Sequence, residues 1–392
     1  MKSYFGILVC CSLLLSGLRA QPATFEVTTS NSPPGAEAAI EFATNIWSQF
    51  LTSEVPIKIQ VNFIQFPGFL GLSLSNGRKN FPGAPIADRW YPLSLVNAMC
   101  GTPINDDDPD MEIYMTTLTN WYFGTDGNPG PNQQDFVSVF LHEIGHSLGM
   151  TSLCNVEGGE GSFGELTPPI LPTAFAFPDL EGLPSIFDHY LVDAANRSLV
   201  DTDIYPNEST ELAGALTGNA LFFNGDSARA ANNGQPPRLY APGAFAFGSS
   251  CTHLDQNTFR GTENGLMTPF SSSGESKQDP GPIFLGILHD LGWNRPKTIS
   301  STPPPPSRLS GLRVSPNPLL EELRIDYELE RSEEVQLLIR DAHGRLLYQS
   351  PPQRQPAGAN VLFWTAEGMS SGLYVYQLVA GDELRSGMVV KP

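Results

Sequence analysis

One stretch of the sequence contains most of the candidate site. It reads Asp135-Phe-Val-Ser-Val-Phe-Leu-His142-Glu143-Ile-Gly-His146-Ser-Leu-Gly149-Met150. Its apolar residues recur at the spacing of a buried helix face, and Gly149 permits a sharp turn at its end. His142 and His146 are four residues apart, so a helix carries them on one face. Two imidazoles so placed can bind one zinc ion, with Glu143 beside them as a candidate general base. A surface helix with two solvated histidines is the alternative, but apolar neighbours on most sides disfavour it.

A zinc site that keeps one position open for water needs three protein ligands. In the short metzincin pattern, which also begins with His-Glu-x-x-His, the third histidine follows Gly149 by three residues. That position is Ser152, a poor zinc ligand. Either the site is inactive or the third ligand comes from elsewhere in the chain. The other histidines are His189, His253, His289 and His343.

Three further motifs resemble leishmanolysin-like metzincin zinc metallopeptidases. In chain order they are Gly248-Ser-Ser-Cys-Thr-His253-Leu-Asp255, Asn264-Gly-Leu-Met267-Thr-Pro269 and Ile287-Leu-His-Asp290-Leu-Gly-Trp293. In that family an insertion separates the helix glycine from the third histidine, and a methionine turn follows. The resemblance covers about residues 36–293 and places the insertion at about 153–247.

The resemblance implies that His142, His146 and His253 bind one catalytic Zn²⁺ and that Glu143 is the general base. Met267 then forms the apolar floor below the metal. The implied activity is that of a secreted endopeptidase, which hydrolyses peptide bonds of a protein or peptide substrate with zinc-activated water. His189 is expected to pack within the insertion.

One departure from the family pattern supports a rival interpretation. Some metzincins have a tyrosine two residues after the methionine, where it helps to bind the developing oxyanion, but this chain has Pro269. Zinc itself then carries most of that charge. The rival is a catalytically inactive metzincin-fold surface binding or adhesion protein. The intact set of three histidines and Glu143 favours the enzyme.

The region alternates helix-like and strand-like segments, and the resemblance implies an α+β fold with a metzincin-like catalytic domain at residues 21–296. Helical spacing predicts helices over residues 36–51, 91–99 and 283–293, and residues 55–63 alternate like a strand with one buried face. Residues 111–122 read as a further strand. The resemblance implies that this strand lies at the edge of the sheet, where an extended substrate can pair with it. An ordinary sheet strand is an equally consistent alternative.

Residues 297–308 are a proline-rich linker, and residues 309–392 show short strands at hairpin spacing, as in a small all-β sandwich. Four motifs there resemble the type A sorting domain of the type IX secretion system. They are Leu312-Arg-Val-Ser-Pro316-Asn317-Pro318, Asp341-Ala-His-Gly344-Arg345, Ser371-Gly372-Leu-Tyr374 and Met388-Val-Val-Lys391-Pro392. The resemblance implies export through outer-membrane secretion machinery of a Gram-negative bacterium. The alternative is an adhesion or carbohydrate-binding module.

Composition and the first residues agree with an exported protein. The 392 residues carry a net charge of −19 with no basic run, which argues against nucleic-acid binding. Residues 1–20 have a positive start, an apolar stretch and a small-residue end, so they predict a signal peptide. After it, no apolar stretch approaches the length of a transmembrane segment. The expected location is secreted or at the cell surface.

Cys100, Cys154 and Cys251 lie beyond the signal peptide, and an exported protein can oxidise them. If His253 fills the place of the missing ligand at position 152, Cys154 and Cys251 approach each other. We therefore predict a Cys154–Cys251 disulfide, with Cys100–Cys154 as the competitor. The acidic residues 106–108 and Asp110 read as a plain loop, with a structural Ca²⁺ site as the alternative.

Overall fold

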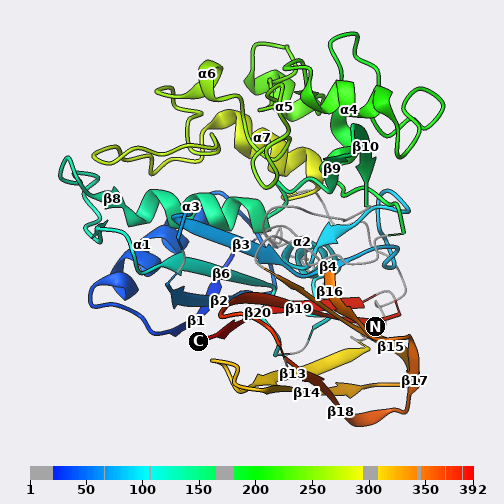
Figure 1. Cartoon of the computed structure of the whole chain (residues 1–392). Coiled ribbons are helices and arrows are strands. Elements are labelled where there is room, and N and C mark those ends of the chain that lie inside the picture. The colour runs from blue at the N-terminus through cyan, green and yellow to red at the C-terminus, as the bar shows by residue number, and fades with distance from the viewer. Residues whose placement is uncertain are drawn as a thin grey trace, which may run out of the picture.

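The computed structural model describes residues 21–65, 67–105, 107–164, 181–294, 308–341, 346–366, 368–381 and 383–392. The predicted signal peptide, Asp106, His343 and nearly all of the predicted linker lie outside these ranges. The described chain mixes helices with a larger share of strands in several sheets, stacked in three tiers (Figure 1). Within this part of the chain, no helix has the length and apolar character needed to cross a bilayer.

A four-stranded sheet in the order β1-β2-β6-β3 forms the middle tier. The first three strands are parallel, and β3 runs antiparallel to β6. Alternate residues of β2, such as Ile59 and Val61, are buried in one core with α1 and α3, which lie on the same side of the sheet (Figure 1). The elements are β1 (Phe25–Ser30), α1 (Ala36–Ser48), β2 (Ile57–Ile64), β3 (Gly71–Ser75), α2 (Leu93–Cys100), β6 (Met111–Thr116), β7 (Trp121–Tyr122), β8 (Gln134–Asp135) and α3 (Phe136–Ser147).

The strand that we expected at the edge of this sheet is an inner strand. β6 begins the predicted stretch 111–122 and pairs with β2 on one side and β3 on the other. The edge strands of this sheet are β1 and β3, so the expected edge position was wrong and the alternative of an ordinary sheet strand is correct. Alternation along one strand indicates which face is buried but contains no information about the order of strands.

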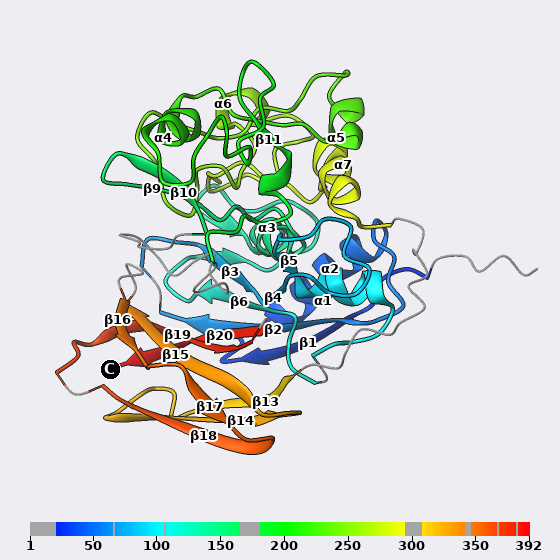
Figure 2. The ribbon, with the colours of Figure 1, turned by 90° about the vertical axis from the view of Figure 1, so that its right-hand side faces the viewer.

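The upper tier contains the described residues of the predicted insertion and the last described part of the predicted peptidase domain (Figure 2). Two polar contacts fix α7 there. Asp290 accepts hydrogen bonds from the backbone N–H groups of Ser227 and Ala228 at the start of α5, and the Trp293 indole donates to the carbonyl of Leu148 at the end of α3. The elements are β9 (Cys154–Glu157), β10 (Glu160–Phe163), η1 (Asp188–Tyr190), β11 (Leu191–Val192), α4 (Thr210–Thr217), β12 (Phe222–Phe223), α5 (Asp226–Ala231), α6 (Gln256–Phe259) and α7 (Pro282–Leu291).

The lower tier consists of strands β13 to β20 around an apolar core that includes Ile325, Tyr327, Ile339 and Leu378. A three-stranded sheet, β13-β14-β18, faces a seven-stranded sheet that contains β15, β16, β17, β19 and β20. The elements are β13 (Leu309–Ser315), β14 (Glu322–Leu329), β15 (Glu333–Asp341), β16 (Leu346–Gln349), β17 (Gln353–Gln355), β18 (Gly358–Thr365), β19 (Gly372–Ala380) and β20 (Glu383–Lys391).

The seven-stranded sheet continues across the predicted linker into the N-terminal part of the chain. β20 pairs with β4 (Gly77–Arg78), which pairs in turn with β5 (Tyr91–Pro92). An apolar cluster lies beside this join, containing Leu72 and Tyr114 from the middle tier and Leu384 and Met388 from β20. Division at residues 297–308 stays a prediction, but the C-terminal strands are packed against the middle tier (Figure 2).

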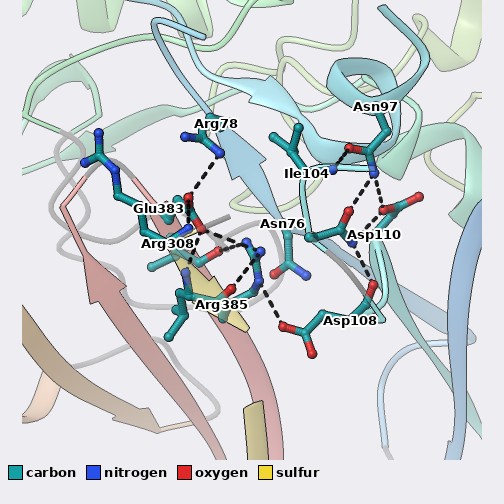
Figure 3. A network of polar contacts seen from close by, with 12 residues as sticks. Asn76, Arg78, Asn97, Ile104, Asp108, Asp110, Arg308, Glu383 and Arg385 are labelled. Atoms are coloured by element: carbon teal, nitrogen blue, oxygen red, sulfur yellow. Dashed lines mark hydrogen bonds and ion pairs between the residues drawn. The ribbon is translucent and has the colours of Figure 1, made fainter. Parts of the chain in front are cut away.

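A buried carboxylate lies at the centre of this junction (Figure 3). Glu383 is 1% exposed and forms an ion pair with Arg78 at 3.0 Å between Oε1 and Nη1. It also accepts the backbone N–H of Arg308 at 2.6 Å, and the Arg385 guanidinium lies 3.7 Å from its second oxygen. Arg385 reaches Asp108 at 3.5 Å, so both arginines connect the middle and lower tiers.

Candidate metal centre

Helix α3 presents the first two histidines as predicted. Asp135 caps its start by accepting the backbone N–H of Ser138, which satisfies one of the free donors of the first turn. Gly149, at φ 140°, lets the chain turn away after the helix. The spacing of four residues then places His142 and His146 side by side, with 3.0 Å between their Nε2 atoms.

His253 completes a cluster of three imidazoles. Its Nε2 atom lies 3.1 Å from Nε2 of His142 and 3.1 Å from Nε2 of His146. Among the residues that the structure describes, these three form the only group of His, Cys, Asp or Glu placed to hold a metal ion. The predicted three ligands therefore meet at one point.

The hydrogen bonds of the three Nδ1 atoms explain why the three Nε2 atoms point toward one another. Each Nδ1 lies within 2.9 Å of a backbone carbonyl oxygen, and a carbonyl can only accept, so each Nδ1 carries the proton. Each Nε2 then presents a lone pair to the other two, an arrangement that a bound cation stabilises and that is repulsive without one. The pairs are His142 with Leu266, His146 with Met150, and His253 with Ser249.

The environment keeps these imidazoles neutral, as metal ligands must be. Burial and, to a smaller extent, the neighbouring His146 lower the pKa of His142 to about 3. Burial likewise lowers the pKa of His146 to about 4 and that of His253 well below its ordinary value. The three nitrogen donors lie 3.0–3.1 Å from one another, so they can bind one metal ion together.

Met267 packs against the helix that carries the first two histidines, and its role as the floor of the site stays a prediction. Its backbone carbonyl accepts the N–H of Leu254, the residue after His253, at 2.8 Å. Its sulfur packs against Gly145 of α3: a Cβ atom at that position would lie only 2.8 Å from Sδ. The glycine between the two helix histidines thus allows Met267 to approach α3 closely.

Glu143 lies in the cleft beside the cluster. Its side chain is 7% exposed and packs against Gly71 of the edge strand β3, where an added Cβ would lie 2.6 Å from Oε1. Burial raises the pKa of Glu143 to about 8. A buried carboxyl with a pKa near neutrality is suited to accept and return a proton.

A cavity of about 350 Å³ contains this constellation. One wall is the edge strand β3 with the preceding residues 68–70, another is α3, and a third is the segment around residues 266–277. The lining includes all three histidines, Glu143 and Lys277. The cleft is large enough for part of an extended peptide rather than for a whole folded protein.

His189, His289 and Ser152 lie outside the metal cluster. His189 is half-buried and outside the cluster, in agreement with packing inside the insertion, and His289 is exposed with its Nδ1 at 2.9 Å from the Ser227 hydroxyl. The Ser152 hydroxyl accepts the backbone N–H of Cys154 and so stabilises the turn after α3.

Cys154 and Cys251 are adjacent thiols. The Cys154 side chain is hydrogen-bonded to Cys251, and burial together with this contact raises the pKa of the Cys251 thiol well above its ordinary value. Both are buried, whereas Cys100 is half-buried elsewhere. The expected proximity is present, and the disulfide itself stays a prediction.

The carboxylates of the acidic loop that the structure describes form ion pairs or hydrogen bonds with other residues of the chain. Asp107 pairs with Lys58, Asp108 with Arg385, and Asp110 accepts the side-chain amides of Asn97 and Asn105. Within the described part of the chain these carboxylates form no metal cluster.

Sequence reasoning missed two residues of the cleft. Gly71 makes room for Glu143, and Lys277 adds a cation to the cavity. Gly71 lies in an ordinary-looking strand and Lys277 in a serine-rich loop, so neither carries a motif. Only the contact with α3 distinguishes them.

Comparisons with known proteins do not identify a family. No protein-family model matches the chain. An uncharacterized protein of Schizosaccharomyces pombe is 29% identical over 122 residues, 31% of this chain. The chain spans 21% of the length of that curated relative.

Two solved structures from Porphyromonas gingivalis are weakly similar. Latent PorU is 19% identical with a TM-score of 0.18, covering 21% of this chain and 9% of its own. PorZ, described as a surface component of the type IX secretion system, is 23% identical with a TM-score of 0.17, covering 21% of this chain and 11% of its own. At such TM-scores the likeness supports no conclusion about this chain.

Proposed function

We propose that the chain is a secreted zinc-dependent endopeptidase of metzincin type. The observation that carries the proposal is the convergence of three neutral imidazoles, each with Nδ1 on a carbonyl and Nε2 toward the others, beside a buried carboxyl in a cleft. His142, His146 and His253 would hold the ion. The order of the sequence motifs adds the leishmanolysin-like assignment.

A zinc ion bound here would supply a Lewis acid that polarises a peptide carbonyl and makes water a stronger nucleophile. Glu143 takes a proton from the attacking water on a side-chain oxygen and passes it to the leaving amine. Burial raises the pKa of Glu143, and a cation held by the three histidines would lower that pKa again and favour the carboxylate form that accepts the proton. Gly71 leaves the space between β3 and α3 that this carboxyl occupies, because a side chain at position 71 would collide with it.

The edge strand β3 is the substrate-binding element of this proposal. It pairs with β6 on one side only in the four-stranded sheet, and it lines the cavity with Gly71, Leu72 and Ser73. An extended peptide can therefore add to its open side by main-chain hydrogen bonds. This replaces the role that the sequence assigned to residues 111–122.

Export by a type IX secretion system remains part of the proposal and rests on the sequence motifs of residues 309–392. The rival function is an inactive binding or adhesion protein of the same fold. Pro269, in the place of the tyrosine found in some metzincins, is the observation that favours the rival.

Zinc stoichiometry followed by a protease assay tests the proposal on the full chain. We expect one zinc per wild-type chain, loss of zinc in His253→Ala, and no change in the exposed control His289→Ala. Glu143→Gln should keep zinc and lose at least about 99% of casein hydrolysis, because a positioned acid–base group contributes roughly 10²–10⁴-fold. Zinc-loaded wild type without hydrolysis of any tested protein would favour the binding protein, and equal zinc in His253→Ala would refute the ligand set.

A further inference from the structure

One cation lies in the cleft, on the wall that follows the methionine turn. Lys277 is the only lysine or arginine among the described residues that line the cavity. The chain as a whole carries a net charge of −19, so a single positive group in the cleft differs from its surroundings. Lys277 and all three histidines line the same cavity, so a peptide bound over the cluster can reach this cation.

The backbone of Lys277, and not its ammonium group, connects this residue to α3. Its N–H donates to the Ser138 hydroxyl at 2.5 Å, and Ser138 in turn donates to Asp135, the N-cap of α3. Its aliphatic chain passes Gly265, where an added Cβ would lie 3.4 Å from Cε. The loop is thereby tied to the helix that carries His142.

The ammonium group has unused donor capacity. It donates one hydrogen bond, to the Thr268 hydroxyl at 3.3 Å. The neighbouring Glu275 is paired with Arg260 at 2.9 Å, and no carboxylate of the described residues lies within ion-pair distance of Lys277. An ammonium has three donors, so two remain for a ligand.

We propose that Lys277 selects substrates with an acidic side chain, Asp or Glu, next to the scissile bond. This inference rests on the proposed peptidase function and adds its substrate class. A carboxylate entering the cavity would receive a charge-assisted hydrogen bond in a partly desolvated place, where such bonds are stronger than in water. The apolar lining by Val139 and Leu266 suits the methylene groups of the same side chain.

Peptide binding to the full-length Glu143→Gln chain tests selection without turnover. The probes are three fluorescent hexapeptides that differ only at one central residue, Glu, Gln or Lys, measured by anisotropy. We expect the Glu peptide to bind about tenfold tighter than the Gln peptide, as for one charge-assisted hydrogen bond. Adding Lys277→Met should abolish this difference, and adding Lys277→Glu should reverse it toward the Lys peptide.

The control is Lys391→Met, which removes the same charge from β20, outside the cavity, and should leave the tenfold preference unchanged. Zinc content and thermal unfolding of each variant establish that it is folded. Equal binding of all three peptides to a folded, zinc-loaded chain overturns the inference.

Cleavage of a peptide mixture by the wild type separates this inference from the proposed function. Cleavage enriched beside Asp and Glu, and lost as an enrichment in Lys277→Met, supports both. Efficient cleavage with no acidic enrichment refutes selection by Lys277 and leaves the peptidase standing. If the Glu peptide binds in a Lys277-dependent way but no peptide is cleaved, the acidic preference is supported and the proposed peptidase function is refuted. A uniform fall in kcat for all peptides in Lys277→Met, with binding preferences unchanged, overturns the assignment to selection.

Discussion

Replacing Glu383 by alanine should destabilise the whole chain through the junction between the middle and lower tiers. The carboxylate is buried, pairs with Arg78 at 3.0 Å and accepts the Arg308 N–H at 2.6 Å. Alanine leaves the buried Arg78 guanidinium without this partner. Removing one member of a buried ion pair costs about 3–5 kcal/mol, because the remaining charge stays desolvated.

Urea unfolding of the full chain, followed by tryptophan fluorescence, measures this loss. The matched control is Asp326→Ala, which breaks the pair with Arg324 on the surface of β14, where both side chains are more than a third exposed. We expect that control to leave the free energy of unfolding close to the wild-type value, because water screens an exposed ion pair.

A double-mutant cycle isolates the pair itself. Arg78→Ala alone should cost a similar amount to Glu383→Ala, and the double variant should cost clearly less than the sum of the two. If Glu383→Ala unfolds within about 1 kcal/mol of the wild type, the C-terminal strands are not coupled to the rest of the chain through this carboxylate, and our reading of the junction fails.

Three further predictions follow from single contacts. Gly71→Ala should keep zinc but lower kcat at least about tenfold, because the new methyl group displaces Glu143; unchanged kcat with full zinc content would contradict this positioning role. Burial raises the pKa of Glu112 to about 7, so the folded state holds a proton that the unfolded state releases, and stability should fall as pH rises from about 4.5 to about 7. Glu112→Gln should flatten that part of a urea-midpoint profile, and a slope equal to that of the wild type would refute the assignment. Non-reducing peptide mapping of exported protein should find Cys154 linked to Cys251, and recovery of Cys251 as an alkylated thiol would exclude the disulfide.

The metal cluster could be predicted because its signal is local and chemical. The helix period places His142 and His146 together, and the order of motifs resembles a family in which a distant histidine completes the set. The third ligand was open from spacing alone, since Ser152 occupies the nearest position. Only the resemblance selected His253, and the structure brings it to 3.1 Å from both others.

What could not be predicted depends on contacts between segments far apart in the chain. β4 is two residues long, so its pairing with β20 leaves no periodic pattern in the sequence. Glu383 reads as an ordinary charged residue beside a turn, although the fold buries it. The predicted position of residues 111–122 in the sheet was wrong for the same reason. The place of β3 at the sheet edge depends on β6 lying between β2 and β3.

The pairing of β20 with β4 also sets an order of events during synthesis. A ribosome completes β3, β4 and every residue of the metal cleft before it makes β20, which covers Leu72 and Tyr114. Until then the outer side of the central sheet presents an apolar face and the open edge of β4, features that lead to aggregation. The C-terminal strands therefore protect the central sheet as well as completing their own sandwich.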